Sequence, residues 1–229
     1  TFGSANAPHA YSIIAIAEQG LPTDFPDDVL TQADKADPND IDANARTDLR
    51  DIAFVTIDPA EARDHDDAVF AEPDPAPDNA GGHIVWVAIA DDAVYVRPDS
   101  PMDKEARKRG NSVYMPDRVV PMLPERLSTD LCSLREHEER PCMAVRMRFD
   151  AYGKKLGHKF VRGTMRSAAK LSYQEAQRVF DSTPESLPED APGKALAENV
   201  LHPLWDAYQA MAQARETRAP LIIDKPERR

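Results

Sequence analysis

Cysteine, long apolar runs and net positive charge are all scarce or missing in this chain of 229 residues. The two cysteines, Cys132 and Cys142, are too few for a disulfide framework and lack the second ligand pair that a zinc site needs. The longest purely apolar run, Ile84 to Ala90, is far shorter than the roughly 20 residues that cross a bilayer. The apolar stretch from Tyr11 to Ala17 has no basic flank, which argues against a secretory signal. We therefore expect no membrane partner and a reducing, cytoplasmic location.

Acidic side chains outnumber basic ones by 40 to 28, so the net charge is −12. The charge is unevenly distributed: residues 1–100 hold 21 acids and 5 bases, whereas residues 101–170 hold 9 acids and 16 bases. A uniformly basic nucleic-acid coat is excluded. The basic middle could still attract a phosphate polymer locally, although solvated surface charge is the simpler interpretation of such blocks.

Local patterns predict strands and helices in alternation, which is typical of an α+β domain. Apolar runs predict buried strands at Ile52–Ile57, from Ala68 onward and at Ile84–Ala90, with the loop from Glu72 to Gly82 forming a long hairpin. The alternation from Cys142 to Phe149 predicts a half-buried strand with Arg146 and Arg148 in an outer cationic row.

Three helices carry recognisable sequence signals. Ser100-Pro101-Met102-Asp103 predicts a helix start and Gly110 its end, with Lys104, Arg107, Lys108 and Arg109 exposed. Ser172 followed by Glu175 predicts a capping box. Apolar residues from Leu196 to Met211 follow helical spacing and predict a helix that bends near Pro203.

The densest group of acids is the string TIDPAEARDHDDA, which contains Asp58, Asp64, Asp66 and Asp67. Four carboxylates this close repel one another unless they fan out into water or share a cation. Magnesium takes carboxylate and water oxygens and leaves positions open for substrate phosphates. A solvated acidic loop is the competing interpretation, because Asp favours turns. His65, within the string, is expected to be an exposed filler rather than a ligand.

Several strings then occur in the order known from one enzyme family: TIDPAEARDHDDAVF, VAIAD, YV and ARKRGNSVYMPDRVVPMLPERLSTDLCSL. Between about Asp48 and Lys170 the chain closely resembles the RNB catalytic domain of the ribonuclease II and ribonuclease R family. FGSANAP and MRSAAKLSYQEAQ resemble the ribonuclease R branch of alphaproteobacterial type. The resemblance implies a mixed β-sheet flanked by helices.

What the resemblance implies about function is a magnesium-dependent 3′ to 5′ exoribonuclease that hydrolyses single-stranded RNA to 5′-mononucleotides, with Mn²⁺ as an alternative cofactor. In that reading Asp58 and Asp67 hold the metal most directly, Asp64 supports them, and loss of Asp66 should damage the chemistry most. Asp66 and Asp67 are thus the catalytic candidates. Tyr114 matches an aromatic that stacks on the 3′-terminal base, although burial statistics alone favour a core role for it. Arg107, Lys108, Arg109, Arg146, Arg148, Lys159 and Arg162 are weaker candidates for an RNA path.

The expected organisation is a lead-in or linker at 1–47 and the N-terminal portion of an RNB catalytic domain at 48–229. In relatives the domain continues and supplies an arginine, a further acid and another aromatic. We therefore expect little activity from these residues alone, and we expect a missing C-terminal half or a partner chain to complete the domain. The alternatives are a catalytically silent RNA- or metal-binding module and a structural or interaction domain.

Overall fold

A computed structural model describes residues 8–38, 41–42, 45–182 and 193–218. The described residues divide into two compact units, one within residues 8–41 and 92–131, the other within residues 42–91 and 132–218. Among the described residues, no helix combines the length and the apolar character needed to span a membrane.

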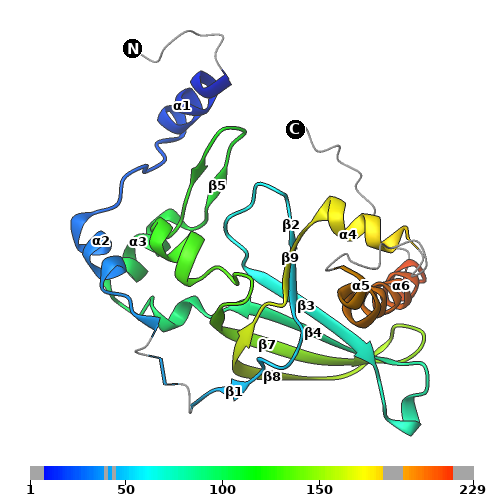
Figure 1. Ribbon diagram of the computed structural model, residues 1–229. Helices are drawn as coiled ribbons and strands as arrows, with labels where there is room; N and C mark the ends of the chain where they lie inside the picture. The colour runs from blue at the N-terminus through cyan, green and yellow to red at the C-terminus, as the bar shows by residue number, and fades with distance from the viewer. Residues whose placement is uncertain (1–7, 39–40, 43–44, 183–192, 219–229) are drawn as a thin grey trace. The chain divides into compact units, whose positions relative to one another are not determined.

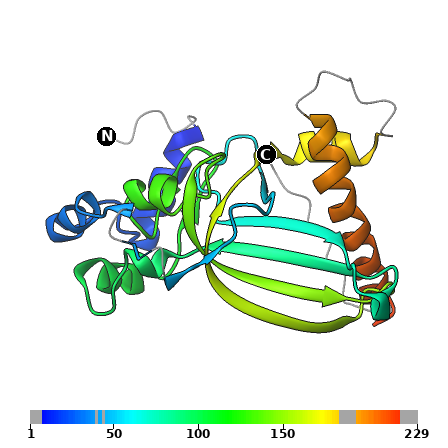
Figure 2. The ribbon, with the colours of Figure 1, turned by 60° about the horizontal axis from the view of Figure 1, so that its bottom comes forward.

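The larger unit is built on a seven-stranded sheet, drawn in Figures 1 and 2. The strand order is β1-β8-β7-β4-β3-β2-β9. The pairs β1–β8 and β2–β9 are parallel, and the remaining pairs are antiparallel, so the sheet is mixed. The strands span β1 Thr47–Asp48, β2 Val55–Asp58, β3 Asp67–Pro73, β4 His83–Ala90, β7 Glu139–Phe149, β8 Lys155–Arg166 and β9 Ala169–Ser172.

Helices flank this sheet, which confirms the predicted α+β class. Ala207 of α6 packs against Ala71, Val85 and Phe149 on one face. The other face is covered by a separate cluster that includes Phe54. The helical segments of this unit are η3 Pro77–Asn79, α4 Tyr173–Phe180, α5 Gly193–Leu196, the π-helical turn η7 Ala197–Leu201 and α6 His202–Glu216.

Local signals located several elements correctly. The loop between β3 and β4 closes a long antiparallel hairpin in which Asp67 pairs with Ile89 and Pro73 with His83. The Ser172 side chain accepts a hydrogen bond from the Glu175 backbone, and the reciprocal bond completes the predicted capping box of α4. These features depend on residues close together in the chain, which is why they could be predicted.

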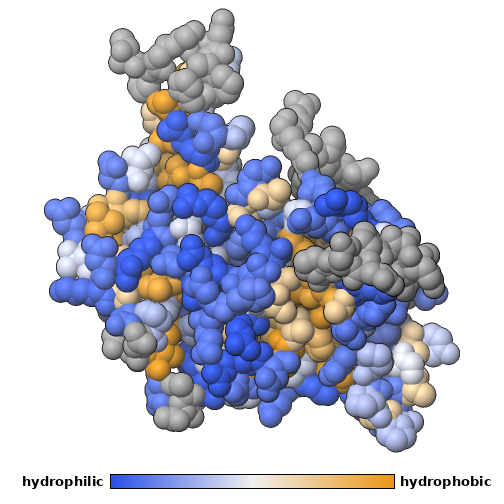
Figure 3. Space-filling view, in the orientation of Figure 1, coloured by the Kyte–Doolittle hydropathy of each residue, from blue (hydrophilic) through white to orange (hydrophobic). Residues whose placement is uncertain are grey.

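The prediction for the strand at Cys142–Phe149 is only half correct. Its alternation is real, but Cys142 and Ala144, on the face assigned to solvent, are fully buried. On the opposite face, Met143 and its cross-strand partner Ile89 are both partly exposed, at 36% and 44% respectively. Each face of the sheet is therefore covered over only part of its length. In Figure 3, apolar side chains gather at the surface beside the position of α5.

The smaller unit consists of helices and one hairpin. Gln32 links its parts, because its side chain accepts from the Met102 backbone at 3.0 Å and donates to the Tyr95 carbonyl at 3.4 Å. The predicted helix is confirmed as α3: Ser100 caps its start and Gly110, at φ +80°, ends it. The elements are α1 Pro8–Gln19, α2 Asp27–Asp34, η4 Asp92–Val94, α3 Pro101–Arg109, β5 Val113–Tyr114, β6 Val119–Val120 and the π-helical turn η5 Leu127–Leu131.

Candidate active site

The acidic residues lie at the ends of two neighbouring strands, on the same side of the sheet. Asp58 is the last residue of β2 and Asp67 is the first residue of β3. The two strands are antiparallel, with Val55 paired to Val69, so the end of β2 and the start of β3 fall on the same side. The connecting segment carries Asp64 and Asp66, and the Asp66 carbonyl accepts a hydrogen bond from the Ala90 amide at 2.9 Å.

These carboxylates differ in their exposure. Asp66 and Asp67 are exposed, whereas Asp58 and Asp64 are half-buried. Burial first, and the charge of Asp58 second, raise the pKa of the Asp67 carboxyl. Asp58 and Asp67 therefore lie within electrostatic reach of each other, and a cation between them would stabilise both charges.

The expectation that His65 is exposed and has no structural role is wrong. Its residue surface is only 3% exposed, and its Nδ1 lies 2.9 Å from Oδ2 of Asp58. Its backbone amide donates to Ser133 Oγ at 3.1 Å, and its carbonyl accepts from the Leu134 amide at 2.8 Å. The sequence contained no signal for this position, because Ser133 and Leu134 follow almost 70 residues later in the chain.

The donor chemistry of the acids fits a hard divalent cation. Carboxylate oxygens are the ligands that magnesium prefers, and it is commonly held by one or two carboxylates together with water and substrate phosphates. Asp58 and Asp67 supply such a pair. Among residues 8–38, 41–42, 45–182 and 193–218, no three His, Cys, Asp or Glu side chains converge into a ready-made ligand set. A cation here would complete its shell with water or phosphate oxygens.

Tyr114 belongs to the smaller unit and ends β5, which pairs with β6 in a short hairpin. The residue is 63% exposed, so it is not a core residue of that unit. Its exposure makes the ring accessible to an aromatic partner, as base stacking would require. Its predicted role with the acids stays a prediction.

Several basic candidates for an RNA path have other partners. The Arg109 side chain is only 2% exposed, pairs with Glu105 at 2.9 Å and lies 3.6 Å above the centre of the Phe25 ring. Its predicted exposure on α3 is therefore wrong. Arg148 forms ion pairs with Asp74 and Asp78 that hold the β3–β4 loop. Apart from Glu105, the partners of these two arginines lie far from them in the sequence or on other elements, so only tertiary packing distinguishes them from ordinary surface charge.

One further residue of the VAIAD string has partners that the sequence could not reveal. Asp91 follows β4, is buried and forms an ion pair with Arg46 at 2.7 Å. Arg162 also approaches the Asp91 carboxylate, at 3.3 Å. Asp91 is thereby engaged in holding the sheet together.

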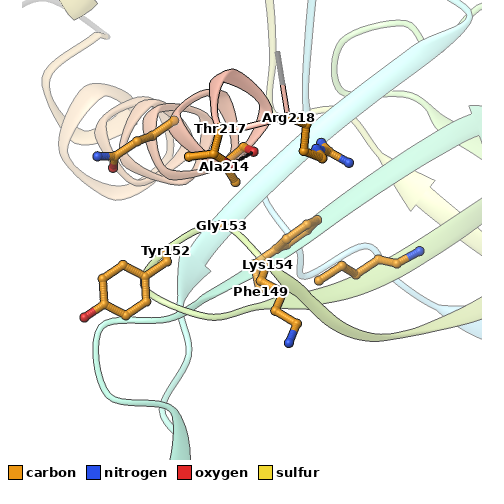
Figure 4. A pocket seen from close by; sticks show the side chains of 9 residues that line it. Phe149, Tyr152, Gly153, Lys154, Ala214, Thr217 and Arg218 are labelled. Carbon is orange, nitrogen blue, oxygen red and sulfur yellow. Dashed lines mark hydrogen bonds between the residues drawn. The ribbon is translucent and has the colours of Figure 1, made fainter. Parts of the chain in front are cut away.

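A pocket of about 630 Å³ lies at the turn between β7 and β8 and the end of α6, as drawn in Figure 4. The acids lie toward the other end of β7, because Asp67 pairs with Ile89 and Ile89 with Met143. The pocket is therefore separate from the candidate site. It is lined by Phe149, Tyr152, Gly153, Lys154, Lys155, Gln213, Ala214, Thr217 and Arg218.

Comparison with known proteins identifies close relatives. Ribonuclease R of Acidithiobacillus ferrooxidans is 43% identical over 222 residues, covering 96% of this chain and 48% of that protein. Ribonuclease R of Escherichia coli K12 is 42% identical over 182 residues, covering 80% of this chain and 21% of that protein. The chain thus spans about half or less of the length of these relatives.

Solved structures agree with this relationship. Mycoplasma genitalium RNase R, determined in complex with double-stranded RNA, superposes with a TM-score of 0.82 at 28% identity. The match covers 95% of this chain and 37% of that one. The family model described as the RNB domain matches residues 46–229, which include all four acids and Tyr114. The chain therefore belongs to the RNB domain family, and the relatives described above are ribonucleases R.

Proposed function

We propose that the natural protein containing this chain is a magnesium-dependent 3′ to 5′ exoribonuclease that degrades single-stranded RNA to 5′-mononucleotides. The observation that carries the proposal is the pair Asp58 and Asp67 at the shared edge of β2 and β3, in a chain that belongs to the RNB family. Related Mycoplasma genitalium RNase R has been determined with double-stranded RNA and with ribose-methylated single-stranded RNA.

In this proposal Asp58 and Asp67 hold the cation and Asp64 supports them. Bound magnesium would stabilise charge on the scissile phosphate and lower the pKa of a water nucleophile. Asp66, exposed between His65 and Asp67, is the carboxylate whose loss should reduce turnover most. Tyr114 would stack on the terminal base, a contact worth about 1–3 kcal/mol that every base can make and that suits an enzyme without sequence preference.

The test uses the full natural protein and a 5′-labelled single-stranded RNA. With Mg²⁺ the RNA should shorten progressively and release 5′-mononucleotides, and a chelator should stop the reaction. Asp66→Asn should abolish cleavage while leaving RNA binding intact. Asp51→Asn, at an exposed acid seven residues before Asp58, is the matched control and should retain full activity.

The 229 residues should be assayed beside the full protein under the same conditions. We expect little or no cleavage from them, because relatives continue well beyond this length. RNA binding without cleavage in the full protein, weakened steeply by salt, would instead favour the silent binding module. Absence of both binding and cleavage would favour a structural role.

A further inference from the structure

Among residues 58–67, all of which the structure describes, His65 is the one buried residue. Asp66 and Asp67 beside it are exposed and Asp64 is half-buried, whereas His65 is 3% exposed. Its imidazole is thus turned away from water and toward the interior of the larger unit. A buried imidazole needs a hydrogen-bond partner, and here that partner is Asp58, 2.9 Å from Nδ1.

The backbone on both sides of the imidazole is fixed by a segment distant in the sequence. Ser133 Oγ accepts from the His65 amide at 3.1 Å and donates to the Arg63 carbonyl at 3.1 Å. The Leu134 amide donates to the His65 carbonyl at 2.8 Å. Ser133 and Leu134 are themselves completely buried. The backbone that carries the ring is therefore anchored to buried residues, and the ring itself is enclosed by the protein.

The chemistry of the contact sets its direction. An ionised carboxylate only accepts hydrogen bonds, so Nδ1 of His65 carries the proton and donates it to Oδ2 of Asp58. Donation to one oxygen restrains rotation of the carboxylate about its Cβ–Cγ bond and leaves the other oxygen for a different partner. Groups that orient a ligand in this way typically change metal affinity or activity by 10–100-fold when they are removed.

We propose that His65 is a positioning residue for Asp58: its Nδ1–H holds the carboxylate in the orientation in which it binds the divalent cation. The inference rests on the proposed function, because it assigns Asp58 to the cation. Beyond that function, the positioning role requires a hydrogen-bond donor at the place of Nδ1. The four aspartates alone do not imply such a donor.

The test replaces His65 in the full natural protein with three side chains that differ in donor placement. Asn places an amide nitrogen where Nδ1 lies, Gln places one where Nε2 lies, and Phe keeps the ring without a donor. Mn²⁺ affinity is measured by titration calorimetry without RNA, and kcat and KM are measured with labelled RNA. His65→Phe should weaken Mn²⁺ binding by about 10–100-fold and lower kcat with little change in KM. His65→Asn should restore most of both, whereas His65→Gln should not.

Asp58→Asn and Asp67→Asn separate the two levels of the hypothesis. If both retain Mn²⁺ affinity, the proposed function fails and the inference fails with it. If both lose Mn²⁺ while folded His65→Phe binds it as the natural protein does, the positioning role alone is overturned. Equal behaviour of the Asn and Gln variants would also overturn it. Circular dichroism and the melting temperature verify folding, and the comparison of Asn with Gln decides the outcome if the Phe variant does not fold.

Discussion

Arg46 and Asp91 form a buried ion pair across four strands of the sheet. Arg46 Nη2 donates to Asp91 Oδ2 at 2.7 Å, and the two side chains are 8% and 5% exposed. Arg46 precedes β1 and Asp91 follows β4, which are separated in the sheet by β8 and β7. Arg46 Nη1 also donates to the Gly163 carbonyl of β8 at 3.2 Å, so one guanidinium links the ends of distant strands.

Removing one partner of this pair should strongly destabilise the protein. Arg46→Met leaves the Asp91 charge buried without its closest counter-ion, and such a change costs about 3–5 kcal/mol. The free energy of unfolding, measured in urea, should fall by that amount. Arg50→Met is the matched control: its pairs with Asp48 and Glu139 are solvent-exposed and screened by water, so the free energy of unfolding should change little. Equal losses in the two variants would contradict the prediction.

Gly153 should not tolerate a side chain. It lies at φ +74° in the turn between β7 and β8, and an added Cβ would come within 2.1 Å of the Ala210 carbonyl oxygen in α6. Because that neighbour is backbone, α6 would have to shift, and we expect Gly153→Ala to lower the free energy of unfolding by about 1–3 kcal/mol. Gly157→Ala, four residues later in β8, meets nothing within 4 Å and should be neutral or slightly stabilising. An unchanged free energy of unfolding in Gly153→Ala would contradict the close contact between α6 and this turn.

Because of the buried Cys142 thiol, we expect the free energy of unfolding to fall in alkaline solution. Burial raises its pKa to about 11 from the ordinary value of 9.0. Above pH 9 the thiol ionises in the unfolded chain but stays protonated in the folded one, so stability falls as the pH rises toward 11. The total change is about 2–3 kcal/mol for a shift of this size. Comparing unfolding of the natural protein and Cys142→Ala between pH 8 and 11 isolates this contribution, and identical pH slopes would contradict it.

Arg109 should contribute to folding rather than to RNA binding. Its guanidinium donates to Glu105 at 2.9 Å and to the carbonyls of Pro22 and Pro121 at 2.9 and 3.1 Å. Arg109→Met leaves the buried Glu105 carboxylate without this partner, and we expect a loss of about 3–5 kcal/mol in unfolding free energy. Lys108→Met, at a side chain that is 69% exposed, should change stability little. A change in the salt dependence of RNA binding for folded Arg109→Met would contradict this assignment.

Much of the fold was predictable where the physical cause is local. The capping box of α4 and the start and end of α3 depend on residues within a few positions, and the β3–β4 hairpin depends on one loop. The parallel pairs β1–β8 and β2–β9 join segments more than 100 residues apart, so no pattern in either segment predicts them. The burial of Cys142 was missed for the same reason, since it depends on what covers that part of the sheet.

For the candidate site, the sequence by itself determined the family, the four aspartates and their place between two strands, because spacing and order within one short segment carry that information. Only the tertiary structure decided that His65 is buried against Asp58, that Arg46 holds Asp91 and that Arg109 is withdrawn from solvent. Each of these contacts joins a charged or titratable group to a partner set by packing. Whether such a group stays in water or is buried against a partner depends on how far folding removes it from solvent. That burial arises from contacts between distant segments, so the sequence alone does not reveal it.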